Sequence, residues 1–413
     1  MSLCLRRALP FGTILGSLSD LLGLRLPLPL QSRPAQIYDG TQDSAEKLPF
    51  SLGNIETVCY QPHLPGRSRS MKRGVILLVF GVMCLALACK KSGQERPGAL
   101  PTPPLDMETL RAELSYVRGE TQTKQGWPRT IRYKHRTHDF RTDTFEEEER
   151  VFEIKRRPTR IVPHAVGVAE ILWAICPRDR LIAFNDICTD PEFCLLADEI
   201  KRTGRIFKTK QTELIIGYEP DLVFTVFYSG EEFKKKLKQA RITYFDLGYF
   251  GTIESIQSQT RLIGQIIGEE GNAEALAKLI DEKIRELRSR IPKDRSGVRV
   301  LYYDEGGYVP GRSSNFNSIC EIIRAVNVGT EQGVKSWSQI DYETLLKWDP
   351  EIIVVPEGSG LAGQLQSNPI LSHAGAVKDG RIYTVPGIYL RVASQYMVLS
   401  ANFLAGIVYA GDS

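Results

Sequence analysis

ELIIGYEPDLV at residues 213–223 and ETLLKWDPEII at residues 343–353 are the two stretches that decide the fold. In each, a glutamate lies seven residues before a proline, an acidic residue follows the proline, and apolar residues come next. Proline ends helices, whereas β-branched residues favour strands. Each stretch therefore predicts a short helix leading into a buried strand, with Thr212 and Asp341 as the helix N-caps. Two such units predict two similar lobes.

Strand-like and helix-like segments alternate on both sides of each stretch. The strand-like segments are 159–163, 181–184, 222–226, 242–245, 298–303, 352–355 and 382–385. The helix-like segments are 167–175, 231–239, 319–325 and the segment that begins at Ser394. This alternation is typical of parallel βαβ units.

A change of pattern separates the two halves. Thr252–Ile267 is helix-like, and Asn272–Arg290 has the apolar spacing of one unbroken amphipathic helix, about 28 Å long. We therefore predict an α/β fold with two Rossmann-like lobes. Their parallel-sheet cores are joined by one long α-helix, and a ligand cleft lies between the lobes.

An export signal precedes these lobes. Met71-Lys72-Arg73 is a positively charged start, residues 74–88 are apolar, and Cys89 follows. The apolar run is shorter than the roughly 20 residues of a membrane-spanning helix, so it indicates a signal peptide. The stretch around Cys89 resembles a bacterial lipobox, although Ala86 stands where leucine is usual, so we expect lipidation at Cys89. Cleavage nearby and an uncleaved anchor are the alternatives.

Domain boundaries follow from these signals. Because a signal peptide acts at an N-terminus, we interpret residues 1–70 as a mispredicted, disordered extension. The remaining divisions are 71–89 as the signal peptide, 90–150 as a linker and polar segment, 151–252 as lobe one, 253–291 as connecting helices, and 292–413 as lobe two. Residues 143–154 could form a β-hairpin.

Composition narrows the function. Among 413 residues, 42% are hydrophobic and 25% charged, and the net charge is only +4, so nothing indicates a nucleic-acid partner. GSGLAG at 358–363 fits a dinucleotide fingerprint, but Pro369 shortens the helix that must follow it. No nucleophile elbow, zinc-protease motif or phosphate-binding loop is present. We predict no enzyme and no cofactor; an exported α/β hydrolase is the enzymatic alternative.

Histidines and cysteines give little support for a metal site. Only His164 and His373 lie in the lobes, too few for a bare metal centre. In an oxidising compartment Cys188 and Cys194 could bridge across a loop, or both could stay as buried free thiols.

Residues 155–410 resemble the cobalamin and iron-siderophore class (class III) of periplasmic substrate-binding proteins of ABC transporters. The stretches that carry the resemblance are RPTRIVP at 157–163, AEIL at 169–172, the run from Thr212 to Val223, and AVKDGRIYTVP at 376–386. It implies an exported, lipid-anchored protein that binds an iron-siderophore, haem or cobalamin-type ligand. The ligand then passes to permease subunits in the membrane. A ligand-sensing surface lipoprotein is the non-transport alternative.

The resemblance also implies site residues. From the sequence alone, favourable charges in a first helical turn are the better explanation of Glu213 and Glu343. The resemblance reverses this preference, because both match the glutamates that meet permease arginines in this family. We expect the ligand cleft to be lined by His164, Asn185, Tyr228 and Phe250 in lobe one and by Tyr308, Arg312, Trp337, Tyr389 and Arg391 in lobe two. His164 could instead be an axial haem ligand.

Overall fold

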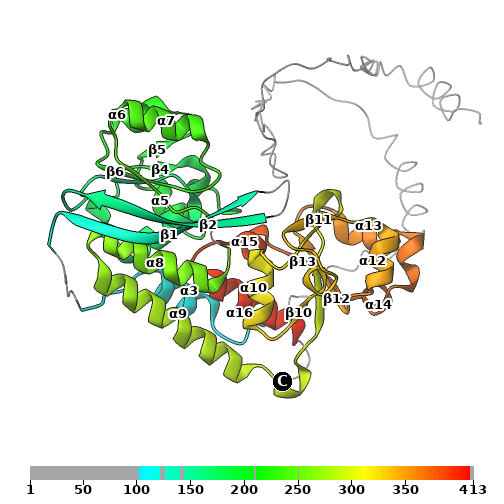
Figure 1. The fold of residues 1–413 in the computed structure, drawn as a ribbon. Coiled ribbons are helices and arrows are strands. Elements are labelled where there is room, and N and C mark those ends of the chain that lie inside the picture. Colours follow the sequence, from blue (N-terminus) through cyan, green and yellow to red (C-terminus); the bar gives the residue numbers. More distant parts are fainter. Residues whose placement is uncertain (1–101, 121–125, 140–143, 209–210, 250, 410–413) are drawn as a thin grey trace, which may run out of the picture. The chain divides into compact units, whose positions relative to one another are not determined.

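The computed structural model describes residues 102–120, 126–139, 144–208, 211–249 and 251–409 (Figure 1). The predicted extension, the signal peptide and Cys89 lie outside these residues. Strands β1 to β7 belong to lobe one and strands β8 to β13 to lobe two. Between the lobes run α8 (Ile253–Ile267) and α9 (Glu270–Arg290). The predicted unbroken helix is confirmed, because α9 is continuous over 21 residues.

Lobe one contains a parallel sheet in the order β3-β6-β7. Its strands are β3 (Ile161–Pro163), β6 (Leu222–Thr225) and β7 (Tyr244–Asp246), and a bridge from Ile161 to Leu181 adds a fourth position beside β3. A second parallel pair joins β4 (Phe184–Asn185) and β5 (Ile206–Phe207). The helical segments are α4 (Val166–Ile175), η2 (Arg178–Arg180), η3 (Asp186–Thr189), α5 (Ala197–Lys201), α6 (Thr212–Gly217) and α7 (Glu231–Gln239).

Lobe two repeats this plan with a parallel sheet in the order β10-β8-β12-β13. Its strands are β8 (Arg299–Tyr302), β10 (Val326–Asn327), β12 (Ile352–Pro356) and β13 (Ile382–Val385), with an antiparallel pair of β9 (Tyr308–Pro310) and β11 (Trp337–Gln339). Its helical segments are η4 (Lys293–Arg295), η5 (Glu305–Gly307), α10 (Asn315–Ile322), α11 (Val328–Glu331), α12 (Tyr342–Trp348), α13 (Leu361–Ser367), η6 (Pro369–His373), α14 (Gly375–Lys378), α15 (Gly387–Arg391) and α16 (Met397–Val408). The predicted α/β class with two parallel-sheet lobes is confirmed.

The helix–strand junction of lobe one is held by an arginine. The last carbonyls of a helix lack partners within it, and the guanidinium of Arg160 supplies donors for those at the end of α6. Its Nε lies 2.9 Å from the Glu219 carbonyl oxygen and its Nη2 2.5 Å from that of Tyr218. The Asp221 carboxylate accepts a hydrogen bond from the Arg160 backbone N–H at 3.0 Å. The chain is thereby turned from α6 into β6, beside β3.

Lobe two has the same junction at the same register. Arg299 donates from Nη1 to the Asp349 carbonyl at 2.7 Å and from Nη2 to the Trp348 carbonyl at 2.7 Å. Glu351 accepts from the Arg299 backbone N–H at 3.0 Å. Glu219 and Asp349 share a positive φ, 48° and 42°. The internal repeat seen in the sequence is therefore a repeat of backbone conformation and of side-chain contacts.

One of the two predicted helix N-caps is confirmed. The Asp341 side chain accepts a hydrogen bond from the Thr344 N–H at 2.9 Å and caps α12 as expected. The expected cap Thr212 is wrong, because α6 begins at Thr212 and Gln211 is the N-cap. A turn places Gln211 there: the Lys208 N–H donates to the Gln211 side chain at 2.9 Å.

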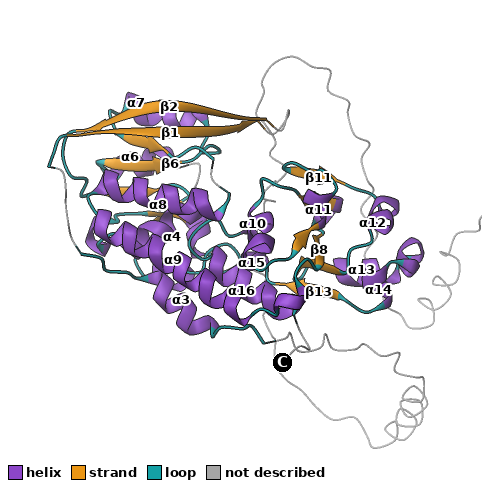
Figure 2. Cartoon of the chain, turned by 60° about the horizontal axis from the view of Figure 1, so that its bottom comes forward, coloured by secondary structure: helices purple, strands orange, loops and turns teal. Residues whose placement is uncertain are grey.

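The fold begins well before the expected lobe boundary at residue 151. Helix α3 (Met107–Ser115) buries Leu110 and Leu114, and a hairpin pairs β1 (Arg129–Asp139) with β2 (Thr144–Ile154). Figure 2 shows β1 and β2 running side by side past β6. The Tyr133 and Phe152 rings lie 4.6 and 4.9 Å from the Phe245 ring of β7. The hairpin therefore completes the core of lobe one.

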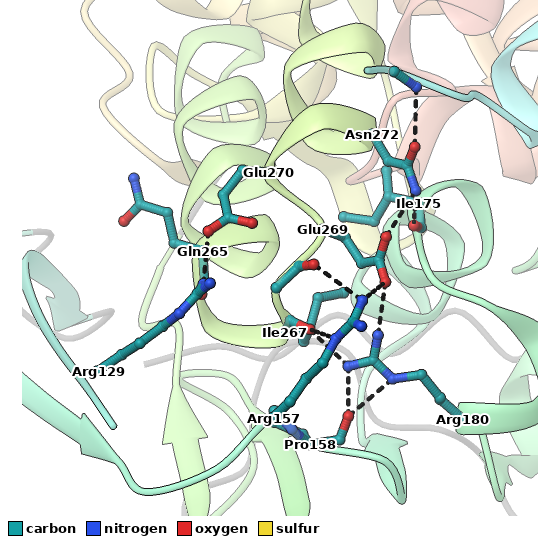
Figure 3. Close-up of polar contacts among 12 residues, drawn as sticks. Arg129, Arg157, Pro158, Ile175, Arg180, Gln265, Ile267, Glu269, Glu270 and Asn272 are labelled. Atoms are coloured by element: carbon teal, nitrogen blue, oxygen red, sulfur yellow. Dashed lines mark hydrogen bonds and ion pairs between the residues drawn. The ribbon is translucent and has the colours of Figure 1, made fainter. Parts of the chain in front are cut away.

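The turn between α8 and α9 is built around one buried carboxylate (Figure 3). Glu269 is 8% exposed and accepts hydrogen bonds from Arg157 Nη2 at 2.6 Å, Arg180 Nη1 at 2.8 Å and Asn272 Nδ2 at 2.9 Å. Arg180 also donates to the Ile267 carbonyl at 2.7 Å, at the end of α8. A buried charge is tolerated only when it is paired and hydrogen-bonded, as here.

Gly248 provides a test of how the hairpin docks on lobe one. Its φ is +69°, and a Cβ there would lie 2.4 Å from the Arg136 carbonyl oxygen of β1. We expect Gly248→Ala to lower the free energy of unfolding by about 3 kcal/mol or more, since strain and a backbone overlap add. Urea unfolding measures this loss.

Gly204→Ala is the matched control. Gly204 has a φ of +67° and open space around its Cβ position, so only the conformational cost, about 1 kcal/mol, should appear. Equal losses in both variants would mean that the hairpin does not pack closely on Gly248.

Candidate functional site

The carboxyl ends of the parallel strands are where α/β folds of this kind bind ligands. In lobe one, Tyr228 follows β6 and Tyr249 follows β7; Tyr228 is 50% exposed. The Tyr249 hydroxyl donates to the Ser313 carbonyl of lobe two at 2.5 Å. The strand-end loops of the two lobes therefore meet at this edge.

Two of the lobe-one residues expected in the cleft are buried. His164 is 5% exposed, its Nδ1 lies 3.0 Å from the Ser229 hydroxyl, and its ring stacks on Phe233 at 4.2 Å. Asn185 is 2% exposed and accepts a hydrogen bond from the Ile187 N–H at 3.0 Å. These contacts are those of packing residues. Phe250 lies outside the described residues.

Lobe two presents more accessible candidates. Trp337 lies on β11, half-buried, with its ring 5.8 Å from that of Tyr302. Tyr308 is half-buried on the neighbouring strand β9, and Arg312 is exposed in the loop that follows. Tyr389 instead stacks on Phe403 of α16 at 4.5 Å, which is a packing contact.

Arg391 forms an ion pair that the sequence did not suggest. Its Nη2 lies 3.2 Å from Oδ1 of Asp304, and the Tyr302 hydroxyl donates to Oδ2 of the same carboxylate at 2.6 Å. The Asp304 residue is 5% exposed, whereas the Arg391 side chain is 33% exposed. The guanidinium is thus held in place by Asp304 while one part stays accessible. The two residues are 87 positions apart, so only the fold reveals the pair.

The lobes also meet at a buried glutamate that sequence reasoning missed. Glu170 of α4 is 1% exposed and accepts hydrogen bonds from the Leu195 N–H at 2.9 Å and the Ser394 hydroxyl at 2.6 Å. Burial raises the pKa of Glu170 to about 7, partly offset by the bonds from Ser394, Leu195 and Cys194. The only signal in the sequence is one acidic residue inside an otherwise apolar helix.

The helix packing beside Glu170 is close. A Cβ added to Gly167 of α4 would lie 2.2 Å from the Ala393 carbonyl oxygen. Gln395 Nε2 donates to the Glu170 carbonyl at 2.9 Å, and the Gln395 residue is fully buried. Lobe one and the segment leading into α16 are therefore joined by a tight, polar contact.

Glu213 and Glu343 take equivalent positions in the first turns of α6 and α12. Both are exposed, and the Glu213 side chain, 74% exposed, pairs with Lys236 at 3.1 Å. A backbone hydrogen bond and Lys236 lower the pKa of Glu213. The two carboxylates are therefore exposed at matching places of the two lobes.

Other features of the described residues carry no site. A hollow of about 430 Å³ is bordered by Tyr116, Arg118, Arg178 and Asn272, away from the strand ends. No three His, Cys, Asp or Glu side chains in the described ranges converge to hold a metal ion.

Cys188 and Cys194 are buried free thiols in the described part of the chain. A hydrogen bond to Cys188, together with burial, raises the pKa of Cys194. None of the described helices combines the length and apolarity that crossing a membrane requires.

Residues 167–389, more than half of the chain, match the family model described as periplasmic binding protein. The chain therefore belongs to the periplasmic binding protein family. The resemblance predicted from the sequence is confirmed at the level of this family.

Individual comparisons agree with this assignment. The chain is 23% identical to the cobalamin-binding protein of Halobacterium salinarum over 203 residues, 48% of this chain and 53% of that protein. It is 27% identical to the Fe(3+)-citrate-binding protein YfmC of Bacillus subtilis over 178 residues, 41% of this chain and 55% of that protein. The chain thus spans about half the length of the curated relatives it matches.

Among solved structures, the fold is similar to that of a Staphylococcus epidermidis protein described as a possible iron-binding (periplasmic solute-binding) protein. The TM-score is 0.56 at 20% identity, covering 62% of this chain and all of that one. At this identity the comparison establishes the fold alone.

Glu170 predicts a pH dependence of stability. Its carboxyl group stays protonated up to about pH 7 in the folded protein but only to about pH 4.5 when unfolded. The folded state therefore binds more protons between these values, and stability falls as the pH rises from 4.5 to 7. The fall should be about 3 kcal/mol, at about 1.4 kcal/mol per pKa unit.

Glu170→Gln keeps both hydrogen-bonding positions and cannot ionise, so this slope should disappear in urea unfolding between pH 5 and 8. Glu305→Gln, at an exposed position, should leave the slope unchanged. Parallel stability curves for wild type and Glu170→Gln would contradict the assignment of the proton to Glu170.

Proposed function

We propose that this protein is the substrate-binding component of an ABC importer and binds an iron-siderophore, haem or cobalamin-type ligand between its lobes. The observation that carries this proposal is the Tyr249–Ser313 hydrogen bond, because it brings strand-end loops of both lobes together at 2.5 Å. A ligand held there would touch both lobes.

The accessible side chains suit a large metal complex. Tyr228 and Trp337 offer aromatic faces, which cover cyclic ligands at a low entropic cost. Arg312 and Arg391 offer guanidinium groups, which pair with ligand carboxylates. The names of the two curated relatives, which refer to cobalamin and ferric citrate, support the same ligand class. The His164–Ser229 pair, 3.0 Å apart, has the residue types of a hydrolase base and nucleophile, but both residues are only 5% exposed and are not placed to meet a substrate. Binding is therefore favoured over catalysis.

Delivery and anchoring belong to the same proposal. The protein is exported, held at the outer face of the cytoplasmic membrane by lipid on Cys89, and docks on the permease through Glu213 and Glu343. Two negative charges on equivalent helices would orient the protein on a positively charged partner and accelerate encounter.

The binding proposal is tested with Trp337→Phe. Native mass spectrometry with haemin, cobalamin, ferric tris-catecholate and ferric citrate identifies the ligand that binds one to one. Affinity for that ligand should then fall about tenfold in Trp337→Phe, because a central aromatic contact is reduced. Trp173→Phe is the control, since Trp173 contacts Phe184 and Arg178 away from the strand ends. Binding of none of the four probes, or equal losses in both variants, would refute this site.

The docking proposal is tested by reversing both charges. Glu213→Lys with Glu343→Lys should abolish ligand uptake in cells and leave the dissociation constant of the purified protein unchanged. Glu232→Lys with Glu282→Lys changes the net charge equally at exposed helix positions and should preserve uptake. A collapse of ligand affinity in the first pair would rule out a purely docking role.

A further inference from the structure

The β1–β2 hairpin has an inner face whose role is explained by packing. Alternate residues of a strand point to opposite faces, and Ile131, Tyr133 and His135 share one of them. Tyr133 and Phe152 pack on Phe245, and His135 Nε2 lies 3.5 Å from the Asp246 carboxylate. This face attaches the hairpin to lobe one.

The outer face changes character at the turn end of the hairpin. Along most of its length this face carries exposed residues such as Arg132, Lys134, Glu147, Glu149 and Val151. At the turn end it carries His138 and Phe145 instead, which pair across the strands and stack at 4.3 Å. His138 is only 7% exposed, and the Arg136 guanidinium lies 4.0 Å from the Phe145 ring. Aromatic residues on a face that is otherwise solvated need an explanation.

The rings continue from the hairpin into the strand-end loops. The Tyr249 ring lies 5.1 Å from Phe145, the Phe227 ring lies 5.1 Å from Tyr249, and the Tyr228 ring lies 4.9 Å from Phe227. The series begins at half-buried Phe145 and ends at Tyr228, which is 50% exposed. Tyr249, within the series, donates its hydroxyl hydrogen to Ser313 of lobe two. The aromatic series therefore reaches the edge where the lobes meet.

We propose that Arg136 and Phe145 of the hairpin, with Phe145 stacked on His138, form a third wall of the ligand site, and that this wall selects ligands with a flat aromatic or conjugated ring. The inference rests on the proposed function and names its ligand class. Ring faces and edges pack favourably on one another, with a guanidinium adding a cation contact. A citrate-type chelate has carboxylates and no ring, so it gains little from this wall. The hairpin precedes residues 167–389, which the family model matches.

The experiment compares three ring-bearing probes, haemin, cobalamin and ferric tris-catecholate, with ferric citrate on the full-length protein. We expect wild type to bind one ring-bearing probe at least tenfold more tightly than ferric citrate. Phe145→Leu and Tyr228→Leu, one on the hairpin and one on the β6 loop, should each weaken that binding about tenfold. Phe145→Leu should leave the ferric citrate affinity unchanged. Val151→Ala is the control, because Val151 is 52% exposed on the outer face of the same strand.

Each outcome decides between the two proposals. Tighter binding of ferric citrate, or unchanged affinity for the preferred ring-bearing probe in Phe145→Leu, overturns the aromatic wall and leaves the proposed function standing. Binding of none of the four probes overturns both. Thermal unfolding of Phe145→Leu distinguishes a lost ligand contact from weakened hairpin packing: an unchanged melting temperature with weaker binding supports the wall, and a lowered melting temperature with equal losses for all probes opposes it.

Discussion

The pairing of one buried carboxylate with two arginines holds this architecture together. Glu269 stands at the turn between α8 and α9, where its charge is surrounded by Arg157, Arg180 and the Asn272 amide. Arg157 and Arg180 come from segments before and after β3, while Glu269 belongs to the connecting helices. Loss of either partner would leave a charge in a poorly solvated position, which is costly. The start of the lobe-one sheet and the connecting helices are therefore joined by buried ion pairs.

The fold could be predicted from the sequence where local chemistry determines local structure. The proline after each short helix, the apolar strand that follows and the amphipathic spacing of α9 all depend on residues close together in the chain. The hairpin predicted within residues 143–154 is wrong, because Thr144–Ile154 forms the single strand β2, whose partner is β1. Glu146–Glu149 are exposed and hide the alternating pattern of β2. The first strand of the hairpin, β1, gave no recognised signal.

The candidate site could be predicted only in part, for a geometric reason. A residue that directly follows a parallel strand is predicted to lie at the ligand-binding end of the sheet. This position does not determine the direction in which its side chain points. Tyr228 points outward, whereas His164 points into the core and stacks on Phe233. Pairs such as Asp304–Arg391 and Glu170–Ser394 join residues 87 and 224 positions apart, so no local pattern reveals them.

The repeated junction has a consequence for symmetry. Arg160 and Arg299 contact the same carbonyl positions, and the strands behind them pair Ile161 with Leu222 and Val300 with Ile352. One polypeptide thus displays the same backbone motif twice, as a homodimer would. Repetition within one chain therefore provides two matching surfaces without dimerisation.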